Sequence, residues 1–290
     1  FYSMFGFQRV GDLLWSAGDS QVRGFLLGGT SGRTTLAGEG LQHQDGHSHL
    51  LAATVPNCIS YDPTYAYELA VIVRDGMRRM LTEQENVFYY LTVLNENYVH
   101  PPMPEGAEEG ILRGMYLLKG GAAGDAPRVQ LLGSGAILRE VLAAAELLRN
   151  DFEVESDVWS VTSFTELRRE GLDAERWNRL HPDETPRDPV VAELLANRRG
   201  PVIASTDYMK AYADQIRAFV PGRYVTLGTD GFGRSDVRER LRHFFEVNRY
   251  YVALAALSAL RDEGAVPADT VHAAMKKYGI DPGKPNPVDV

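Results

Sequence analysis

Short apolar runs and amphipathic segments alternate along this chain, and this alternation restricts it to folds in which helices cover largely parallel sheets. Apolar residues recur at three- and four-residue spacings in the predicted helices, which are residues 4–17, 66–81, 137–149, 166–172, 208–220, 236–246 and 251–263. The predicted buried strands are residues 24–29, 57–61, 86–94, 128–132, 157–161, 202–205 and 224–227. We therefore predict an α/β fold with mostly parallel sheets covered by helices.

A change in composition divides the chain into two parts. Residues 119–127 read KGGAAGDAP, a run that has nothing to bury and that interrupts both helical and strand periodicity. Strand and helix patterns continue on both sides of it. We therefore predict two α/β domains that meet at this segment.

The charge balance and the cysteine content exclude several classes of protein. Asp and Glu number 39 against 30 Lys and Arg, which gives a net charge of −9, so we expect no nucleic-acid partner. No apolar run approaches the roughly 20 residues of a membrane-spanning helix, so we expect no membrane partner. Cys58 is the single cysteine, which excludes an internal disulfide and favours a cytoplasmic location.

The densest group of reactive side chains lies in residues 38–49, which read GEGLQHQDGHSH. This glycine-rich segment holds three of the seven histidines, whose imidazoles transfer protons near neutral pH. Acid–base catalysis or substrate binding is the favoured interpretation. A structural cluster stays open, and so does a metal site made of His43, Asp45, His47 and His49, although the spacing matches no HExxH or CxxC signature.

Three further motifs each allow a structural interpretation. The aromatic-rich residues 2–7 are typical of a core face, while the alternative is a platform for a flat heterocycle. The glycines around Ser134 indicate a tight turn more than an anion site. Asp236 and Glu239 are placed like a helix N-cap and its reciprocal partner. Apart from these motifs, the single Cys58 is predicted to be a small buried hydrophobe.

Long irregular strings across the chain resemble a known family. In the first half they are YSMFGFQR, GGTSGRTT, GEGLQHQDGHSH, PNCISYDP and LNENY, which begin at residues 2, 28, 38, 56 and 94. In the second half they are LLGSG, SVTSFTEL, ASTDYMK and GTDGFGRSD, which begin at residues 131, 160, 204 and 228. Together they closely resemble the homodimeric bacterial pyruvate dehydrogenase E1 components, which are transketolase-like enzymes.

The resemblance implies a fold of two transketolase-like α/β domains. Residues 1–103 resemble the C-terminal part of the pyrimidine-binding middle domain, and residues 128–290 resemble the transketolase C-terminal domain. The resemblance therefore implies a linker over residues 104–127 between the two domains. The diphosphate-binding domain of the family has no counterpart here. Because the chain also opens on FYSMFG without an initiator methionine, we expect it to be a fragment of a longer enzyme.

The resemblance also implies roles for individual residues. Phe5 matches the aromatic residue that packs on the aminopyrimidine ring of thiamine diphosphate, and Tyr2 matches a tyrosine near the substrate. His43 matches the active-site histidine, which is expected to transfer a proton or to hydrogen-bond the substrate or a lipoyl group. Glu39 is expected to help order the site or the dimer contact. The expected catalytic residues are therefore His43, Tyr2 and Glu39, with Phe5 binding the cofactor and no metal ligand in this chain.

For the complete enzyme the resemblance implies oxidative decarboxylation of pyruvate with thiamine diphosphate, and transfer of the acetyl unit to lipoyl groups of an E2 dihydrolipoyl acetyltransferase. It further implies a homodimer. The Mg²⁺ ligands and the glutamate that activates the cofactor are expected upstream of Phe1, in the N-terminal portion of the same enzyme. We therefore expect the isolated chain to be inactive. The alternatives are a non-catalytic assembly or dimerisation module and another transketolase-like thiamine-diphosphate enzyme.

Overall fold

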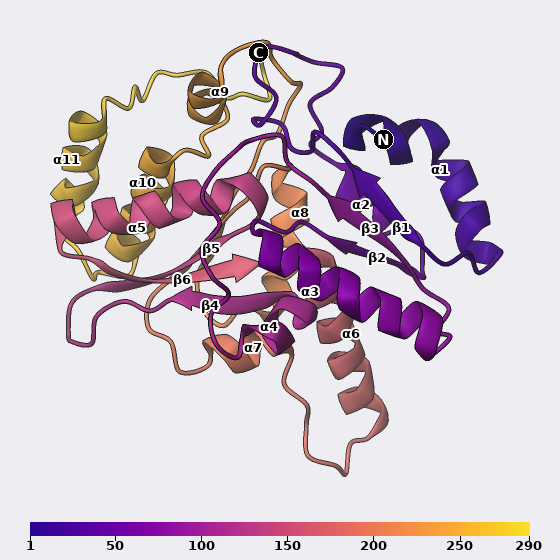
Figure 1. Cartoon of the computed structure of the whole chain (residues 1–290). Coiled ribbons are helices and arrows are strands. Elements are labelled where there is room, and N and C mark those ends of the chain that lie inside the picture. Colours follow the sequence, from indigo (N-terminus) through magenta and orange to yellow (C-terminus); the bar gives the residue numbers. More distant parts are fainter.

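Two sheets with helices on both faces form the molecule, and the computed structural model describes residues 1–290 (Figure 1). The first sheet has three parallel strands in the order β1-β3-β2, namely β1 (Phe25–Gly28), β3 (Phe88–Thr92) and β2 (Cys58–Tyr61). The second has the order β4-β6-β5-β7-β8, namely β4 (Met115–Lys119), β6 (Glu155–Val161), β5 (Arg128–Gly133), β7 (Val202–Ser205) and β8 (Tyr224–Leu227). Only β4 is antiparallel, so the predicted α/β class with mostly parallel sheets is confirmed.

The helices divide between the two sheets. The first sheet is packed by α1 (Ser3–Asp19), α2 (Ser48–Ala52), α3 (Ala66–Met77) with its π-helical end (Arg78–Thr82), and α4 (Ala107–Arg113). The second sheet carries α5 (Leu138–Phe152), α6 (Phe164–Leu180), α7 (Val190–Leu195), α8 (Lys210–Asp214), α9 (Arg238–Phe244), α10 (Arg249–Asp262) and α11 (Ala268–Tyr278), with 3₁₀ turns at Gly135–Ile137 and Arg217–Phe219. None of these helices has both the length and the apolarity needed to cross a lipid bilayer.

Strand β3 shows why the first sheet needs cover on both faces. Its residues are all buried, and alternate side chains point to opposite faces of the sheet. Phe88 and Tyr90 pack with α1 and α2, while Tyr89 and Leu91 pack with α3 and α4. A central strand that is apolar on both faces is stable only between two helical layers.

The second sheet is sandwiched in the same way. Leu131 of β5 and Val158 of β6 face a core formed with α5, α10 and α11, which Figure 1 shows together at one side of the molecule. Leu132 and Trp159, the next residues along the same strands, face the core formed with α6, α7 and α8. Neighbouring residues of one strand face different cores because successive side chains point to opposite faces of the sheet.

The segment predicted to be a linker, residues 104–127, is partly regular structure. It contains α4 and β4, and β4 forms the edge strand of the second sheet by pairing antiparallel with β6. The longest stretch of it outside a helix or strand is the glycine-rich one after Lys119. The domain boundaries at residues 103 and 128 stay a prediction.

Some predicted helices differ in extent from the observed ones. The prediction of one helix over residues 208–220 is wrong, because this segment forms α8 and a separate 3₁₀ turn. The Ala213 carbonyl accepts a hydrogen bond from the Tyr224 hydroxyl at 2.9 Å, so a tertiary contact satisfies a group that a continued helix would have used. Helix α6 runs on to Leu180, beyond the predicted end. The prediction ended early because the exposed second half of this helix shows little apolar periodicity.

The carboxylate of Glu68 joins the two sheets. It lies on α3, is fully buried, and accepts hydrogen bonds from the backbone of Thr64 at 2.6 Å and of Tyr65 at 2.9 Å. From the second sheet, the Tyr116 hydroxyl donates to it at 2.7 Å and the Ser160 hydroxyl at 2.6 Å. Burial raises the pKa of Glu68, and these four bonds oppose that rise.

Candidate functional site

Two segments that are separate in the sequence bring the predicted site residues together in the fold. Tyr2 and Phe5 lie at the start of α1, and His43 lies on the loop that follows β1. The imidazole ring centroid of His43 is 5.2 Å from that of Tyr2 and also 5.2 Å from that of Phe5. The Tyr2 and Phe5 rings are themselves 5.8 Å apart. An isolated bridge between Tyr2 and Gly29 ties the start of α1 to the end of β1, which holds this arrangement.

Glu39 completes this aromatic–imidazole cluster. Its Oε2 atom lies 3.2 Å from Nδ1 of His43, and the two side chains are 44% and 23% exposed. The contact is an ion-pair distance without hydrogen-bond geometry. Because Glu39 faces Nδ1, Nε2 is the ring nitrogen that can meet a substrate. All four predicted residues therefore share one open face.

Two neighbouring residues were not singled out from the sequence. The guanidinium carbon of Arg9 lies 3.9 Å from the centroid of the Phe5 ring, a cation–π contact. Gln8 contacts Nε2 of His47 through its Oε1 at 3.0 Å. Both residues could have been found from their position one helical turn after the aromatic residues, because side chains at positions i and i+4 share a face of a helix.

The site loop, residues 30–47, is anchored to the second sheet's side of the molecule. The Gln44 amide forms two bonds with the backbone of Arg234, donating to its carbonyl at 2.7 Å and accepting from its N–H at 2.8 Å. The backbone N–H of Gly38 donates to the carbonyl of Asp236 at 2.9 Å. A loop without regular structure is therefore positioned by tertiary hydrogen bonds on both sides of His43.

Asp207 anchors the beginning of the same loop. Its carboxylate accepts from the backbone N–H of Thr34 at 3.1 Å, and burial raises its pKa to about 6. Gly32 has a φ of +84°, and a Cβ there would lie 2.2 Å from Oδ2 of Asp207. Only glycine lets the loop approach this carboxylate so closely.

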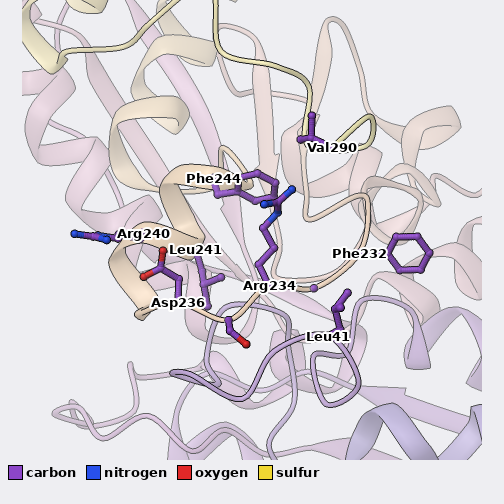
Figure 2. Close-up of a pocket in the computed structure, with 10 residues that line it drawn as sticks. Leu41, Phe232, Arg234, Asp236, Arg240, Leu241, Phe244 and Val290 are labelled. Carbon is purple, nitrogen blue, oxygen red and sulfur yellow. The ribbon is translucent and has the colours of Figure 1, made fainter.

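A cavity of about 460 Å³ lies beside the loop (Figure 2). Leu41, two residues before His43, forms one side of it, and Phe232 and Arg234 form another. Leu41 is 58% exposed and Phe232 is 82% exposed. The part of the site loop that carries Leu41 is therefore accessible to solvent through this cavity.

His49 occupies a different environment from His43, although the two are only six positions apart. It is fully buried, it stacks on Tyr212 at 4.8 Å, and burial lowers its pKa to about 4. The Thr92 hydroxyl donates to Asp62 at 2.7 Å, so its oxygen accepts from Nε2 of His49 at 3.0 Å. His49 is thus a neutral structural histidine.

The side chains considered as metal ligands do not form a common site. Asp45 accepts from the backbone N–H groups of His47 and Ser48 through Oδ1, and His49 faces Thr92. In residues 1–290, no group of three or more His, Cys, Asp or Glu side chains is arranged to hold a metal ion. The loop therefore offers acid–base and binding groups, with no ligand set for a cation.

Two local sequence predictions have clear outcomes. Cys58 is fully buried in β2, as expected of a small hydrophobe. The N-cap prediction for Asp236 is wrong, because α9 begins at Arg238 with Val237 as its N-cap, and the side chain of Asp236 accepts only from the N–H of Val237. The backbone of Asp236 is used instead to hold the site loop at Gly38.

The fully buried Asp62 leads to a testable pH dependence. Burial raises its pKa from 3.8 to about 7, so folding favours its protonated form and ionisation destabilises the fold as the pH rises. We expect Asp62→Asn to gain stability relative to the unmodified chain by about 2 kcal/mol between pH 5 and pH 7. Urea unfolding at several pH values measures this difference. The exposed Asp183→Asn is the control, and an equal gain there would contradict the assignment.

Comparison with known proteins assigns the chain to a family. Residues 1–101 match the family model described as pyruvate dehydrogenase E1 component middle domain, and residues 114–248 match the transketolase-like TK C-terminal domain. The pyruvate dehydrogenase E1 component of Cupriavidus necator is 67% identical over 291 residues, covering 100% of this chain and 32% of the relative. That of Pseudomonas aeruginosa is 67% identical over 290 residues, covering 100% of this chain and 33% of the relative. The chain belongs to the pyruvate dehydrogenase E1 component family.

The fold of this family member is that of transketolases. A transketolase from Pichia stipitis superposes with a TM-score of 0.67 at 14% sequence identity, covering 91% of this chain and 34% of that one. The transketolase of Leishmania mexicana gives a TM-score of 0.66 at 16% identity, covering 92% of this chain and 35% of that one. The predicted family and transketolase-like fold are confirmed. The chain spans about a third of the length of the curated relatives it matches.

Proposed function

We propose that this chain contributes the acid–base and aromatic side chains of a pyruvate dehydrogenase E1 active site. The proposed reaction is the thiamine-diphosphate-dependent oxidative decarboxylation of pyruvate, with transfer of the acetyl unit to lipoyl groups of an E2 acetyltransferase. The observation that carries the proposal is the convergence of Tyr2, Phe5, Glu39 and His43, from two separate segments, on one open face.

The residues present fit the ring portion of thiamine diphosphate. Phe5 is half-buried, Tyr2 is exposed, and both flank an imidazole, so the face combines flat apolar surface with polar edges. Such a face suits a heterocycle that stacks on one side and forms hydrogen bonds at its rim. When bound, the cofactor supplies the electron sink that decarboxylation requires.

The chain's own residues then position the substrate and its protons. Glu39 faces Nδ1 of His43, which orients the ring and leaves Nε2 to hold or transfer a proton at the substrate carbonyl oxygen. The Tyr2 hydroxyl lies at the same mouth and can donate a hydrogen bond to that oxygen. Arg9, stacked on Phe5, fixes the orientation of that ring.

The remaining parts of the proposed enzyme lie outside this chain. Its residues do not fit a Mg²⁺ site, since no suitable group of carboxylates and histidines converges. We place the diphosphate-binding and Mg²⁺-binding groups on the portion of the relatives that this chain does not match. The active assembly is proposed to be a cytoplasmic homodimer that works with lipoylated E2.

A complementation experiment tests the proposal. The chain is mixed with the remaining, N-terminal portion of the Cupriavidus necator relative, thiamine diphosphate and Mg²⁺, and pyruvate-driven CO₂ release is followed. We expect cofactor binding and turnover in the mixture and neither in the chain alone.

The other outcomes identify the alternatives. Cofactor binding without decarboxylation of pyruvate, but with transfer between sugar phosphates, would indicate another transketolase-like enzyme. A folded complex that binds no cofactor would indicate an assembly module. Decarboxylation by the chain alone would contradict the placement of the missing groups.

A further inference from the structure

A pocket lined by arginines lies on the second sheet's side of the molecule, between the start of α5, α9, α10 and the end of α11. Its volume is about 770 Å³. Five of its eleven lining residues are arginines, namely Arg139, Arg238, Arg240, Arg242 and Arg249. Such a concentration of positive charge stands out on a chain whose net charge is −9. The site residues Tyr2, Phe5, Glu39 and His43 take no part in it.

Two carboxylates hold most of these guanidinium groups in place. Glu96, 12% exposed, contacts Arg139 at 2.7 Å and also pairs with Arg242. Glu140, 8% exposed, contacts Arg249 at 3.0 Å and Arg242 at 3.6 Å. The positions of Arg139, Arg242 and Arg249 are therefore set before any ligand arrives, which lowers the entropy cost of binding an anion.

The carboxylates do not neutralise the pocket. The acidic side chains that face these arginines are Glu96, Glu140, the exposed Glu239 and the buried Asp207 behind Arg242, so five arginines face four carboxylates. Arg240 is exposed, makes no ion pair and lines both this pocket and the neighbouring cavity, where Figure 2 shows it on the side opposite Phe232. One positive charge, that of Arg240, thus remains without a paired carboxylate at a concave surface.

The shape and the remaining lining residues narrow the class of ligand. Guanidinium groups bind phosphate oxygens in a bidentate manner, and several of them around one cavity suit linked phosphates. Tyr250 and Tyr278 lie beside Arg249 with their ring centroids 5.0 Å apart, and can contact an uncharged part of the ligand. We propose that this pocket binds the diphosphate group of a small molecule.

Titration with inorganic pyrophosphate and with ADP, without divalent cations, tests the proposal. Calorimetry gives the affinity, and the NMR signals of His243, which lines the pocket, report the location. We expect binding with a Kd below about 1 mM and a shift of the His243 signals. Arg240→Glu should weaken pyrophosphate binding about tenfold or more, because it reverses an unpaired charge that faces the ligand.

The control is Arg176→Glu, the same charge change on the exposed side of α6. It should leave the affinity within about twofold, which separates a local contact from a change in net charge. Arg240 makes no ion pair, so its replacement should leave the thermal unfolding temperature unchanged. Arg249→Gln provides a second variant, for which we expect the same weakening of pyrophosphate binding.

Equal binding of ADP and pyrophosphate supports recognition of the diphosphate alone. Tighter binding of ADP, if Tyr250→Ala removes the difference, supports the tyrosine contact as well.

Three results would overturn the proposal. One is the absence of both heat and His243 shifts at about 5 mM pyrophosphate. Another is an unchanged affinity in Arg240→Glu. The third is sulfate binding as tightly as pyrophosphate, which would indicate general anion attraction. None of these outcomes depends on the decarboxylation assay, so the two proposals fail separately.

Discussion

In the complemented assembly, His43→Ala is expected to release CO₂ from pyruvate about 100-fold more slowly, the usual scale for loss of a positioned acid–base group. The imidazole lies 5.2 Å, centroid to centroid, from both Tyr2 and Phe5, and its Nδ1 is held toward Glu39. Alanine removes the group that holds or transfers a proton while leaving the aromatic face intact. Cofactor binding, measured in the same samples by calorimetry, should change by less than about threefold, because stacking on Phe5 is retained.

The variant His272→Ala is the matched control for this experiment. His272 is exposed on α11, away from the site, and its removal should leave turnover unchanged. A second comparison, Glu39→Gln, should lower turnover less than His43→Ala, since the amide keeps the contact with Nδ1 but removes the charge. Full activity of His43→Ala with an active assembly would remove His43 from the mechanism and leave the family assignment standing.

Replacing Glu68 with alanine is expected to destabilise the chain by about 4 kcal/mol. The change leaves four buried donors without an acceptor, on Thr64, Tyr65, Tyr116 and Ser160. It also opens a void between α3 and the second sheet. The free energy of unfolding from urea titration measures the loss.

Glu68→Gln separates the lost acceptor from the lost charge. The amide retains one acceptor oxygen and fills the volume, so it should cost less than the alanine change, about 2 kcal/mol. Glu175→Ala, on the exposed side of α6, is the matched control and should change stability by less than about 0.5 kcal/mol. A small effect of Glu68→Ala would mean that water or a local shift satisfies the four donors.

The candidate site could be located from the sequence, but its geometry could not. Residues 38–49 stood out because histidines, carboxylates and glycines are concentrated there, and the long strings carried the family resemblance. Periodicity alone favoured a core role for Tyr2 and Phe5, whereas both remain at least partly exposed beside His43. His43 and His49 are similar in sequence context, yet one lies at an open face and the other is fully buried.

The sequence by itself determined the alternation of strands and helices, the parallel character of the sheets and the segment that holds the reactive side chains. These properties depend on the local spacing of apolar and polar residues, which is visible in any short window. Only the tertiary structure decided that β4 joins the second sheet, that Glu68 links both sheets, and that five arginines surround one pocket. Such arrangements arise from contacts between residues far apart along the chain, whose formation depends on how whole layers pack.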